Sequence, residues 1–281
     1  DLSKVKQIPV STQETKTAVV YTLMYVDDLM LCCEYQRDIK EIISNLNKEV
    51  EIKQLGQVSY YLGIQIDREE DESFLLSQKQ KILDLVENLG MQDANPVHTS
   101  METGFYKQKE LSELLPNNQG YREVIGKQLY LASVTRADIA AAVGILCRRT
   151  SSPTQRDWNG IKRVVKYLKC TAQFKLKLPS TGNTVLVGFT DADWTEDISD
   201  QRSTSGYVFF YGGGPINSSY KQGSIAHSST EAEYILAAAA CHEIVWLKLL
   251  LADLNVDEPT PVTLYEDNQS CIIRKMSNII L

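Results

Sequence analysis

The sequence predicts a mixed α/β protein, α+β overall, with strand-rich parts towards both ends and helices between them. Two stretches, 19–31 and 58–76, hold apolar runs and period-two alternation, which are typical of strands. Residues 121–170 instead carry apolar side chains at helical spacing. After residue 173 the pattern runs strand, strand, strand, helix, strand, helix, which indicates a sheet with acidic residues at the ends of its elements.

Length and composition indicate a globular protein with room for two hydrophobic cores. The 281 residues are 43% hydrophobic, and no apolar run reaches the length that spans a bilayer, so we expect no membrane partner. The net charge of −7 argues against a globally basic nucleic-acid binder, but not against a nuclease or polymerase that gathers acids around a metal ion. The six scattered cysteines form no zinc or disulfide pattern and no signal peptide is visible, which predicts an intracellular location, in the cytoplasm or the nucleus.

The first predicted element is a β-hairpin whose tip carries two acids. Tyr25-Val26-Asp27-Asp28 lies between the apolar stretches 19–24 and 29–31. Two adjacent carboxylates in such a run are costly unless they are paired or bound to a metal ion. The sequence therefore predicts that the hairpin pushes Asp27 and Asp28 out at its tip.

Helices and strands are expected to alternate between this hairpin and residue 90. The first helix has one apolar face and is expected to end at Gly56; its apolar residues are Ile39, Ile42, Ile43, Leu46 and Val50. A strand at 58–66, a charged turn at 67–72 and a return strand at 74–76 follow. The second helix places Gly90 at its C′ position, and its apolar residues are Ile82, Leu85, Val86 and Leu89.

A loop and three helices make up the predicted middle of the chain. The loop covers 91–118, and the helices are expected at about 121–135, 137–150 and 154–170, with Pro153 at the start of the third. The stretch Ile161–Lys169 in the third helix is strongly basic. Its two interpretations are the solvated face of an amphipathic helix, which we favour, and a nucleic-acid-binding patch.

The C-terminal elements are predicted from alternation, glycine turns and a long apolar helix. In chain order they are strands at 174–178, 185–190 and 206–211, a turn at 212–215, a short strand near 224–226, a helix at 229–253, a strand at 262–265 and a helix from Asn268. Asp191 follows the second of these strands, Glu231 lies in the first turn of the long helix, and Asp267 follows the last strand.

These three acids predict a metal site if their elements are neighbours in the fold. Carboxylates that converge in one cleft repel one another and stay charged only with a divalent cation between them. Oxygen ligands alone favour Mg²⁺ or Mn²⁺ over zinc. Two such ions can activate a water molecule and stabilise the leaving oxygen of a phosphate ester.

Each acid also has an alternative explanation. Asp191 and Asp193 are typical turn residues at the end of a strand. Glu231 fits the N3 position of a helix capped by Ser228, and Asp267 fits a cap of the last helix. Thr230 and Glu233 would form the same capping box two residues later.

An ordered series of motifs resembles the Pol polyproteins of copia-type (Pseudoviridae) LTR retrotransposons. The C-terminal motifs resemble the ribonuclease H domain of that family; they are Asp191-Ala192-Asp193-Trp194, Arg202–Tyr207, Ser228–Tyr234 and Asp267–Ser270. The upstream motifs resemble its reverse transcriptase and connecting region; they are Tyr25–Asp28, Tyr61–Ile64, Tyr121-Arg122, Ile125-Gly126, Thr135–Ile139 and Arg163–Lys169. The resemblance implies a partial reverse-transcriptase palm at 1–100, a helical thumb or connection at 101–172, and a C-terminally truncated ribonuclease H-like mixed sheet with flanking helices at 173–281.

The resemblance also implies roles for individual residues. Asp27 and Asp28 would be metal-binding carboxylates of the palm, and Tyr61, Leu62 and Gly63 match the segment that grips the primer end. Asp191, Glu231 and Asp267 would be the catalytic ligands of Mg²⁺ or Mn²⁺ in the ribonuclease H domain, with Asp193 as a weaker candidate. The implied partner is an RNA–DNA hybrid or another nucleic acid, and no protein partner is indicated.

Departures from the family pattern leave more than one function open. Only Asp1 precedes Asp27, the fourth ribonuclease H acid is not found before Leu281, Asn217–Tyr220 replaces an apolar Trp segment, and His227 stands where Leu is common. We therefore expect no polymerase activity from the chain alone. The hypotheses are residual metal-dependent cleavage of RNA in hybrids, or an inactive remnant that binds nucleic acid or protein. A third is an interaction surface on the long helix, formed by Val245, Trp246, Leu249 and Leu250.

Overall fold

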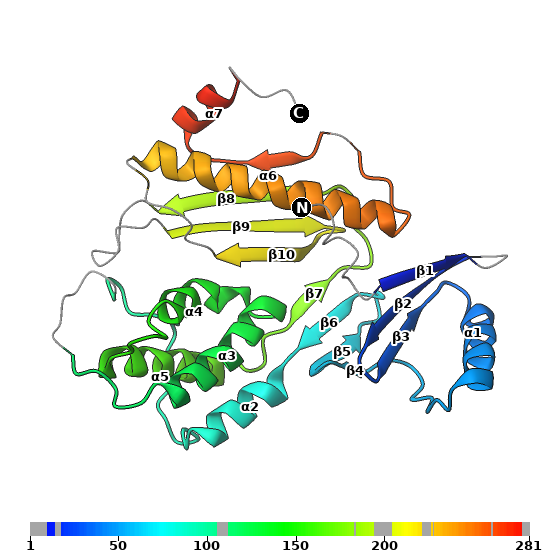
Figure 1. Cartoon of the computed structure of the whole chain (residues 1–281), viewed down its shortest axis with the longest axis horizontal. Helices are drawn as coiled ribbons and strands as arrows, with labels where there is room; N and C mark the ends of the chain where they lie inside the picture. The colour runs from blue at the N-terminus through cyan, green and yellow to red at the C-terminus, as the bar shows by residue number, and fades with distance from the viewer. Residues whose placement is uncertain are drawn as a thin grey trace. The chain divides into compact units, whose positions relative to one another are not determined.

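The fold is mixed α/β, as predicted (Figure 1). The chain falls into two compact units. The computed structural model describes residues 10–14, 18–105, 112–182, 184–193, 204–220, 226, 228–259 and 261–276. The first unit comprises Asp1–Leu62 and His242–Thr260, and the second comprises Gly63–Cys241 and Pro261–Leu281. The division at residues 100 and 172 implied by the family resemblance stays a prediction.

The first unit is built on a three-stranded antiparallel sheet in the order β1-β2-β3. Its strands are β1 (Val10–Glu14), β2 (Val19–Tyr25) and β3 (Asp28–Cys32), followed by α1 (Gln36–Glu49) and the short β4 (Tyr60–Tyr61). The predicted hairpin of β2 and β3 is confirmed, with Tyr25 opposite Asp28. The Tyr21 hydroxyl donates a 3.0 Å hydrogen bond to the Leu254 carbonyl, which ties the sheet to the turn after α6 (Ser229–Asp253).

Two predicted boundaries in this part of the chain are wrong. Helix α1 ends at Glu49 rather than at Gly56, because Val50 already takes an extended conformation (φ −140°, ψ 139°). The single strand predicted at 58–66 is interrupted, because Leu62 (φ 50°) and Gly63 (φ 83°) both adopt the left-handed conformation and turn the chain. Strand β5 (Ile64–Arg68) begins only after that turn.

A small sheet of the second unit joins segments that are far apart in sequence. Strand β6 (Phe74–Ser77) pairs antiparallel with β5 on one side and with β7 (Leu176–Leu178) on the other. Ion pairs run along the same edge: Lys175 Nζ lies 2.8 Å from Asp67, and Lys177 Nζ lies 2.6 Å from Glu69. These side chains are largely exposed, so solvent screens each pair and its contribution to stability is small.

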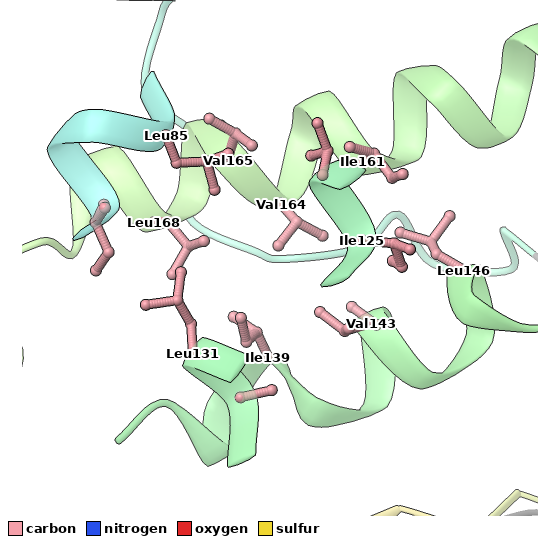
Figure 2. Close-up of a cluster of buried hydrophobic side chains, with 14 of the residues drawn as sticks. Leu85, Ile125, Leu131, Ile139, Val143, Leu146, Ile161, Val164, Val165 and Leu168 are labelled. Atoms are coloured by element: carbon pink, nitrogen blue, oxygen red, sulfur yellow. The ribbon is translucent and has the colours of Figure 1, made fainter. Parts of the chain in front are cut away.

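Four helices and a 3₁₀ turn form the main hydrophobic core (Figure 2). They are α2 (Lys79–Asn88), α3 (Gln119–Val134), the 3₁₀ turn Ala137–Ile139, α4 (Ala140–Cys147) and α5 (Gln155–Cys170). Figure 2 shows α5 side chains, among them Val164 and Leu168, directed towards Val143 and Leu131 of the facing helices. Thr154 and Asp157 make a capping box that fixes the start of α5, next to Pro153 as predicted. The three predicted helices are therefore confirmed, with boundaries shifted by a few residues.

A second sheet, in the order β10-β9-β8-β11, carries the C-terminal acids. Its elements are β8 (Val187–Asp193), β9 (Thr204–Tyr211), β10 (Gly214–Tyr220), α6, β11 (Thr263–Tyr265) and α7 (Gln269–Met276), which confirms the predicted order. Strand β8 runs past Asp191 instead of ending before it, since the residues up to Asp193 still pair with β9. Strand β10 was not predicted, and the strand predicted near 224–226 falls mostly outside the described residues.

Helix α6 contradicts the expectation that no segment could span a membrane. In the part of the chain that the structure describes, α6 is the one helix that is long and apolar enough to cross a membrane. Of its most apolar 18-residue stretch, 28% is buried. Core helices of soluble proteins have the same length and composition. Leu236, Ala240 and Leu247 of α6 are buried within the protein.

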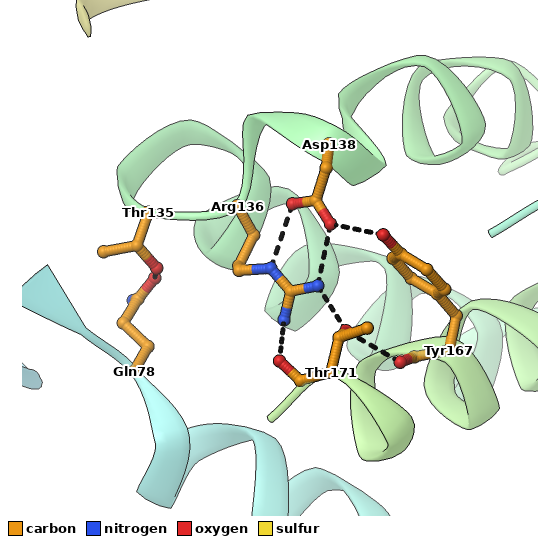
Figure 3. Close-up of polar contacts among 6 residues, drawn as sticks. All are labelled: Gln78, Thr135, Arg136, Asp138, Tyr167 and Thr171. Atoms are coloured by element: carbon orange, nitrogen blue, oxygen red, sulfur yellow. Dashed lines mark hydrogen bonds and ion pairs between the residues drawn. The ribbon is translucent and has the colours of Figure 1, made fainter. Parts of the chain in front are cut away.

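A buried arginine connects the ends of α3 and α5 (Figure 3). Arg136 is 2% exposed and binds Asp138 through two parallel hydrogen bonds of 2.9 and 2.8 Å. Its guanidinium also donates to the Thr171 carbonyl (3.2 Å) and hydroxyl (2.5 Å), and the Tyr167 hydroxyl donates to Asp138. Burial alone would raise the pKa of Asp138, but the bonds from Arg136 and Tyr167 outweigh it and lower that pKa.

We expect Arg136→Lys to lower the free energy of unfolding by about 1–3 kcal/mol, because an ammonium cannot reproduce the planar fork in a buried site. Urea unfolding followed by circular dichroism measures this difference. Arg68→Lys is the matched control, since Arg68 pairs with Glu72 on the surface and should change stability by less than about 0.5 kcal/mol. Equal effects of the two substitutions would show that burial does not matter to the Arg136 contacts.

Candidate metal centre

Strands β8 and β11 bring Asp191 and Asp267 together. They pair in parallel with Tyr265 beside Phe189, and each acid lies two residues beyond that pair. Because the two strands run in the same direction, this equal offset places both acids at the carboxyl-terminal end of the paired strands. Both side chains are exposed there.

Glu233 joins the two aspartates from helix α6. It lies on the buried stripe of the helix with Ala232 and Leu236, which pack against Ala192 of β8. One carboxylate oxygen from each of Asp191, Glu233 and Asp267 lies within 4.8 Å of the others. Glu233 is 4% exposed, and its Oε2 is buried without a hydrogen-bond partner in the described part of the chain.

The electrostatics of Glu233 reflect this crowding. Burial is the largest influence, and the negative charges of Glu266, Asp191 and Asp267 act in the same direction. Together they raise the pKa of Glu233 to about 7, although a hydrogen bond from the Ala192 backbone opposes them. A divalent cation would balance these negative charges and remove the repulsion between the carboxylates. The three acids therefore fit a site for such a cation.

The structure brings Glu233, and not Glu231, to the cluster. Residues two positions apart on an α-helix are separated by roughly 200° of rotation about its axis, so Glu231 and Glu233 lie on nearly opposite faces of α6. The Glu231 backbone N–H donates 3.2 Å to the Ser228 hydroxyl, as in the alternative interpretation of Glu231 as an N3 residue of a capped helix. The place that sequence analysis gave to Glu231 is therefore taken by Glu233, while metal binding itself stays a prediction.

The residues around Asp267 have separate tasks. Asn268 caps α7, because its Oδ1 accepts a 2.9 Å hydrogen bond from the Cys271 N–H. The alternative role of Asp267 as that cap is therefore wrong. Glu266 accepts hydrogen bonds from the Thr190 hydroxyl (2.8 Å) and from the Asn268 N–H (3.0 Å). No sequence pattern pointed to a role for Glu266 or Thr190, although both lie next to a predicted ligand.

The other predicted acid pair, Asp27 and Asp28, lies at the tip of the β2–β3 hairpin in the first unit. Both residues are exposed, as predicted, so solvent rather than a metal ion can balance their charges. Val26, which directly precedes the two acids, has a φ of 53°, a strained conformation for a β-branched residue. Among the described residues, no third acid, histidine or cysteine forms a ligand group with this pair.

The predicted primer-gripping residues lie at and after β4. Burial and the charge of Asp28 raise the pKa of Tyr61, which places its phenol within electrostatic reach of the hairpin tip. Leu62 and Gly63 form the left-handed turn, and a Cβ added at Gly63 would overlap the end of the Lys81 side chain. Gly63 is thus explained by backbone conformation and packing, and primer binding stays a prediction.

The basic stretch of α5 belongs to an amphipathic helix, but two of its cations contact the preceding loop and are not simply solvated as the favoured interpretation had it. Arg163 contacts Glu102 at 3.1 Å and the Thr99 hydroxyl at 2.9 Å, and Lys169 donates to the Ala94 carbonyl at 2.9 Å. These two cations therefore hold the preceding loop, while the buried residues of the helix face the core. The alternative of a nucleic-acid patch gains no support from Arg163 or Lys169.

An open hollow of about 400 Å³ lies apart from these acids in sequence. Residues 114–118 and 151–153 line it, and none of them has an ionisable side chain. It offers no ligands for a metal ion and no acid or base, so the cluster of Asp191, Glu233 and Asp267 is the better candidate for chemistry.

Comparison with known proteins gives sequence relatives but no structural one. Residues 11–103 match the family described as reverse transcriptase (RNA-dependent DNA polymerase). The chain is 34% identical over 252 residues to a retrovirus-related Pol polyprotein from transposon RE2 of Arabidopsis thaliana, covering 89% of this chain and 17% of that protein. It is 33% identical over 261 residues to the corresponding polyprotein from transposon TNT 1-94 of Nicotiana tabacum, covering 90% of this chain and 20% of that one. No solved structure matches.

A much shorter relative is covered almost completely. An uncharacterized mitochondrial protein of Arabidopsis thaliana is 33% identical over 228 residues, which are 81% of this chain and 94% of that protein. The chain thus spans about a fifth of the two transposon polyproteins but nearly all of this shorter relative.

We expect Glu233→Gln to stabilise the metal-free protein at pH 8 but not at pH 5. A carboxyl whose pKa rises from 4.5 to about 7 on folding contributes stability below pH 4.5, and that contribution is lost as the pH rises to 7. The glutamine variant lacks this loss, so the difference in unfolding free energy should grow by about 1–3 kcal/mol between the two pH values. Urea unfolding in EDTA measures it.

Glu231→Gln is the matched control for this experiment, because Glu231 lies on the other side of α6. It should show the same small effect at both pH values. A difference between Glu233→Gln and the unmodified protein that does not change with pH would contradict the crowding of carboxylates around Glu233.

Proposed function

Because the chain belongs to the family of retrovirus-related Pol polyproteins of copia-type transposons, and is reverse transcriptase-like over 11–103, we propose that its C-terminal part is a ribonuclease H-type centre. It would cleave the RNA strand of an RNA–DNA hybrid with Mg²⁺ or Mn²⁺. The observation that carries the proposal is the buried, unpaired oxygen of Glu233 beside the oxygens of Asp191 and Asp267.

The three residues divide the work between the inside and the outside of the protein. Glu233 contributes its carboxylate from the buried side of the cluster, and the packing of α6 against β8 fixes the position of this residue. Asp191 and Asp267 are exposed and present their oxygens to a substrate that arrives from solvent. When bound, divalent cations in such a site activate a water molecule and stabilise the leaving oxygen of the phosphodiester.

For the first part of the chain we propose a contribution to polymerase chemistry rather than an activity of its own. Asp27 and Asp28 would supply two metal-binding carboxylates of a palm, and Tyr61, close to Asp28, would contact the primer end with Leu62 and Gly63. Phosphoryl transfer depends mostly on positioning the reactants. The described residues place no third carboxylate with this pair, so polymerisation is not proposed for this chain.

The remaining family expectations are proposals of the same kind. We propose a palm-like part at 1–100, a thumb- or connection-like part at 101–172 and a ribonuclease H-like part at 173–281. An intracellular location is supported by the six cysteines, all of which are free thiols.

A second candidate function is binding of nucleic acid without cleavage. The number of ligands favours it, because the cluster in the described residues has three acids and Mg²⁺ requires nearly ideal octahedral coordination. Binding that weakens steeply with salt, without turnover, would distinguish this candidate from the nuclease.

We expect the protein to cleave an RNA–DNA hybrid in Mn²⁺, and Glu233→Gln to lower the rate at least about a hundredfold. Loss of one anionic ligand removes several kcal/mol of stabilisation from the metal-assisted step, and each 1.36 kcal/mol corresponds to a factor of ten in rate. The assay follows a hybrid labelled on its RNA strand. Asp191→Asn and Asp267→Asn should have effects of the same size.

Glu231→Gln is again the matched control, and it should keep the rate within about threefold because Glu231 is not in the cluster. Equal losses from Glu231→Gln and Glu233→Gln would point to the helix start rather than to metal ligation. If the protein binds the hybrid but cleaves it neither with Mg²⁺ nor with Mn²⁺, the nuclease is rejected and binding without cleavage is the function that remains.

A further inference from the structure

We propose that Glu266 is a positioning residue of this centre, which holds Asp191 and Asp267 close enough together that both could serve as ligands of a divalent cation. The inference rests on the proposed function, since it concerns the affinity of the same site for its cation. Glu266 is half-buried, and it directly precedes Asp267 in the chain. Its role follows from its two hydrogen bonds, one to β8 next to Asp191 and one to the backbone next to Asp267.

Both oxygens of Glu266 are occupied, and by different elements. Oε2 accepts a 2.8 Å hydrogen bond from the hydroxyl of Thr190, the residue before Asp191 on β8. Oε1 accepts a 3.0 Å hydrogen bond from the N–H of Asn268, the residue after Asp267 and the cap of α7. One carboxylate therefore connects the side chain of the residue before Asp191 with the backbone N–H of the residue after Asp267.

This connection opposes a force that would separate the two aspartates. Their carboxylates and that of Glu233 lie within 4.8 Å of one another and repel one another when ionised. The pairing of β11 with β8 ends at Tyr265, two residues before Asp267. Beyond Tyr265, the hydrogen bond between Glu266 and Thr190 still connects the segment that carries Asp267 to β8.

Two other roles for Glu266 fit the contacts less well. As a direct ligand it would have to give up a hydrogen bond, since each of its oxygens already accepts one. As a helix cap it is unnecessary, because Asn268 caps α7. The Thr190 hydroxyl also lies 3.2 Å from the Tyr265 carbonyl, but it has a single proton to donate, and the Glu266 carboxylate at 2.8 Å is the nearer acceptor.

Titration of the whole chain with Mn²⁺, followed by calorimetry, tests the inference by a double-mutant cycle. Glu266→Gln and Thr190→Val should each weaken Mn²⁺ binding about tenfold, the lower end of the range for residues that orient metal ligands. The double variant should bind no more than about twofold more weakly than Glu266→Gln, because both substitutions break the same link. Glu266→Asp keeps the charge but shortens the reach, and should also weaken binding.

The outcomes separate this inference from the proposed function. No Mn²⁺ binding by the unmodified protein would overturn both. Normal binding that Glu266→Gln changes by less than twofold would overturn only the positioning role. A loss confined to Glu266→Gln, with Thr190→Val and Glu266→Asp unaffected, would assign Glu266 to charge or ligation and would also overturn it. If Glu266→Gln does not fold by circular dichroism, Thr190→Val and Glu266→Asp decide the question.

Discussion

The parallel pairing of β11 with β8 is the constraint on which the acidic cluster depends. It sets Tyr265 beside Phe189, and therefore sets Asp267 beside Asp191 two residues further on. Helix α6 then packs its small residues against Ala192, which fixes the depth at which Glu233 enters. Hydrophobic packing and backbone pairing thus place three acids together, although their charges alone would drive them apart.

Burial distinguishes the two acidic sites of the chain. Asp27 and Asp28 are exposed at a hairpin tip, where water can stabilise their charges. Glu233 is almost fully buried, has an oxygen without a partner, and its pKa is raised to about 7. Such an arrangement costs stability in the absence of a cation, and a cost of this kind is a common property of functional sites.

The sequence predicted the large elements well because their signals are local. The apolar stripe of α5, the length of α6 and the two acids between apolar runs each depend on residues within one segment. What failed depended on distant partners or on fine geometry. Strand β10 contains Asn217, Ser218 and Ser219, and its pairing with β9 rather than its composition makes it a strand.

The choice between Glu231 and Glu233 has a similar origin. Two glutamates two residues apart both fit a metal site on sequence grounds, and both belong to capping-box patterns. Which of them faces inward depends on where α6 begins and on which face meets β8, and a sequence alone does not fix that rotation. The hydrogen bond of Ser228 and the packing of Ala232 and Leu236 decide it in favour of Glu233. Glu266 was missed because its role consists of bonds to Thr190, 76 positions away in the chain.

The most direct test of the central claim is a crystal structure grown with Mn²⁺, with data collected to give the anomalous signal of manganese. We expect a peak in direct contact with carboxylate oxygens of Asp191, Glu233 and Asp267. A peak bound by Glu231, or a well-ordered cluster with no manganese at saturating concentration, would contradict it.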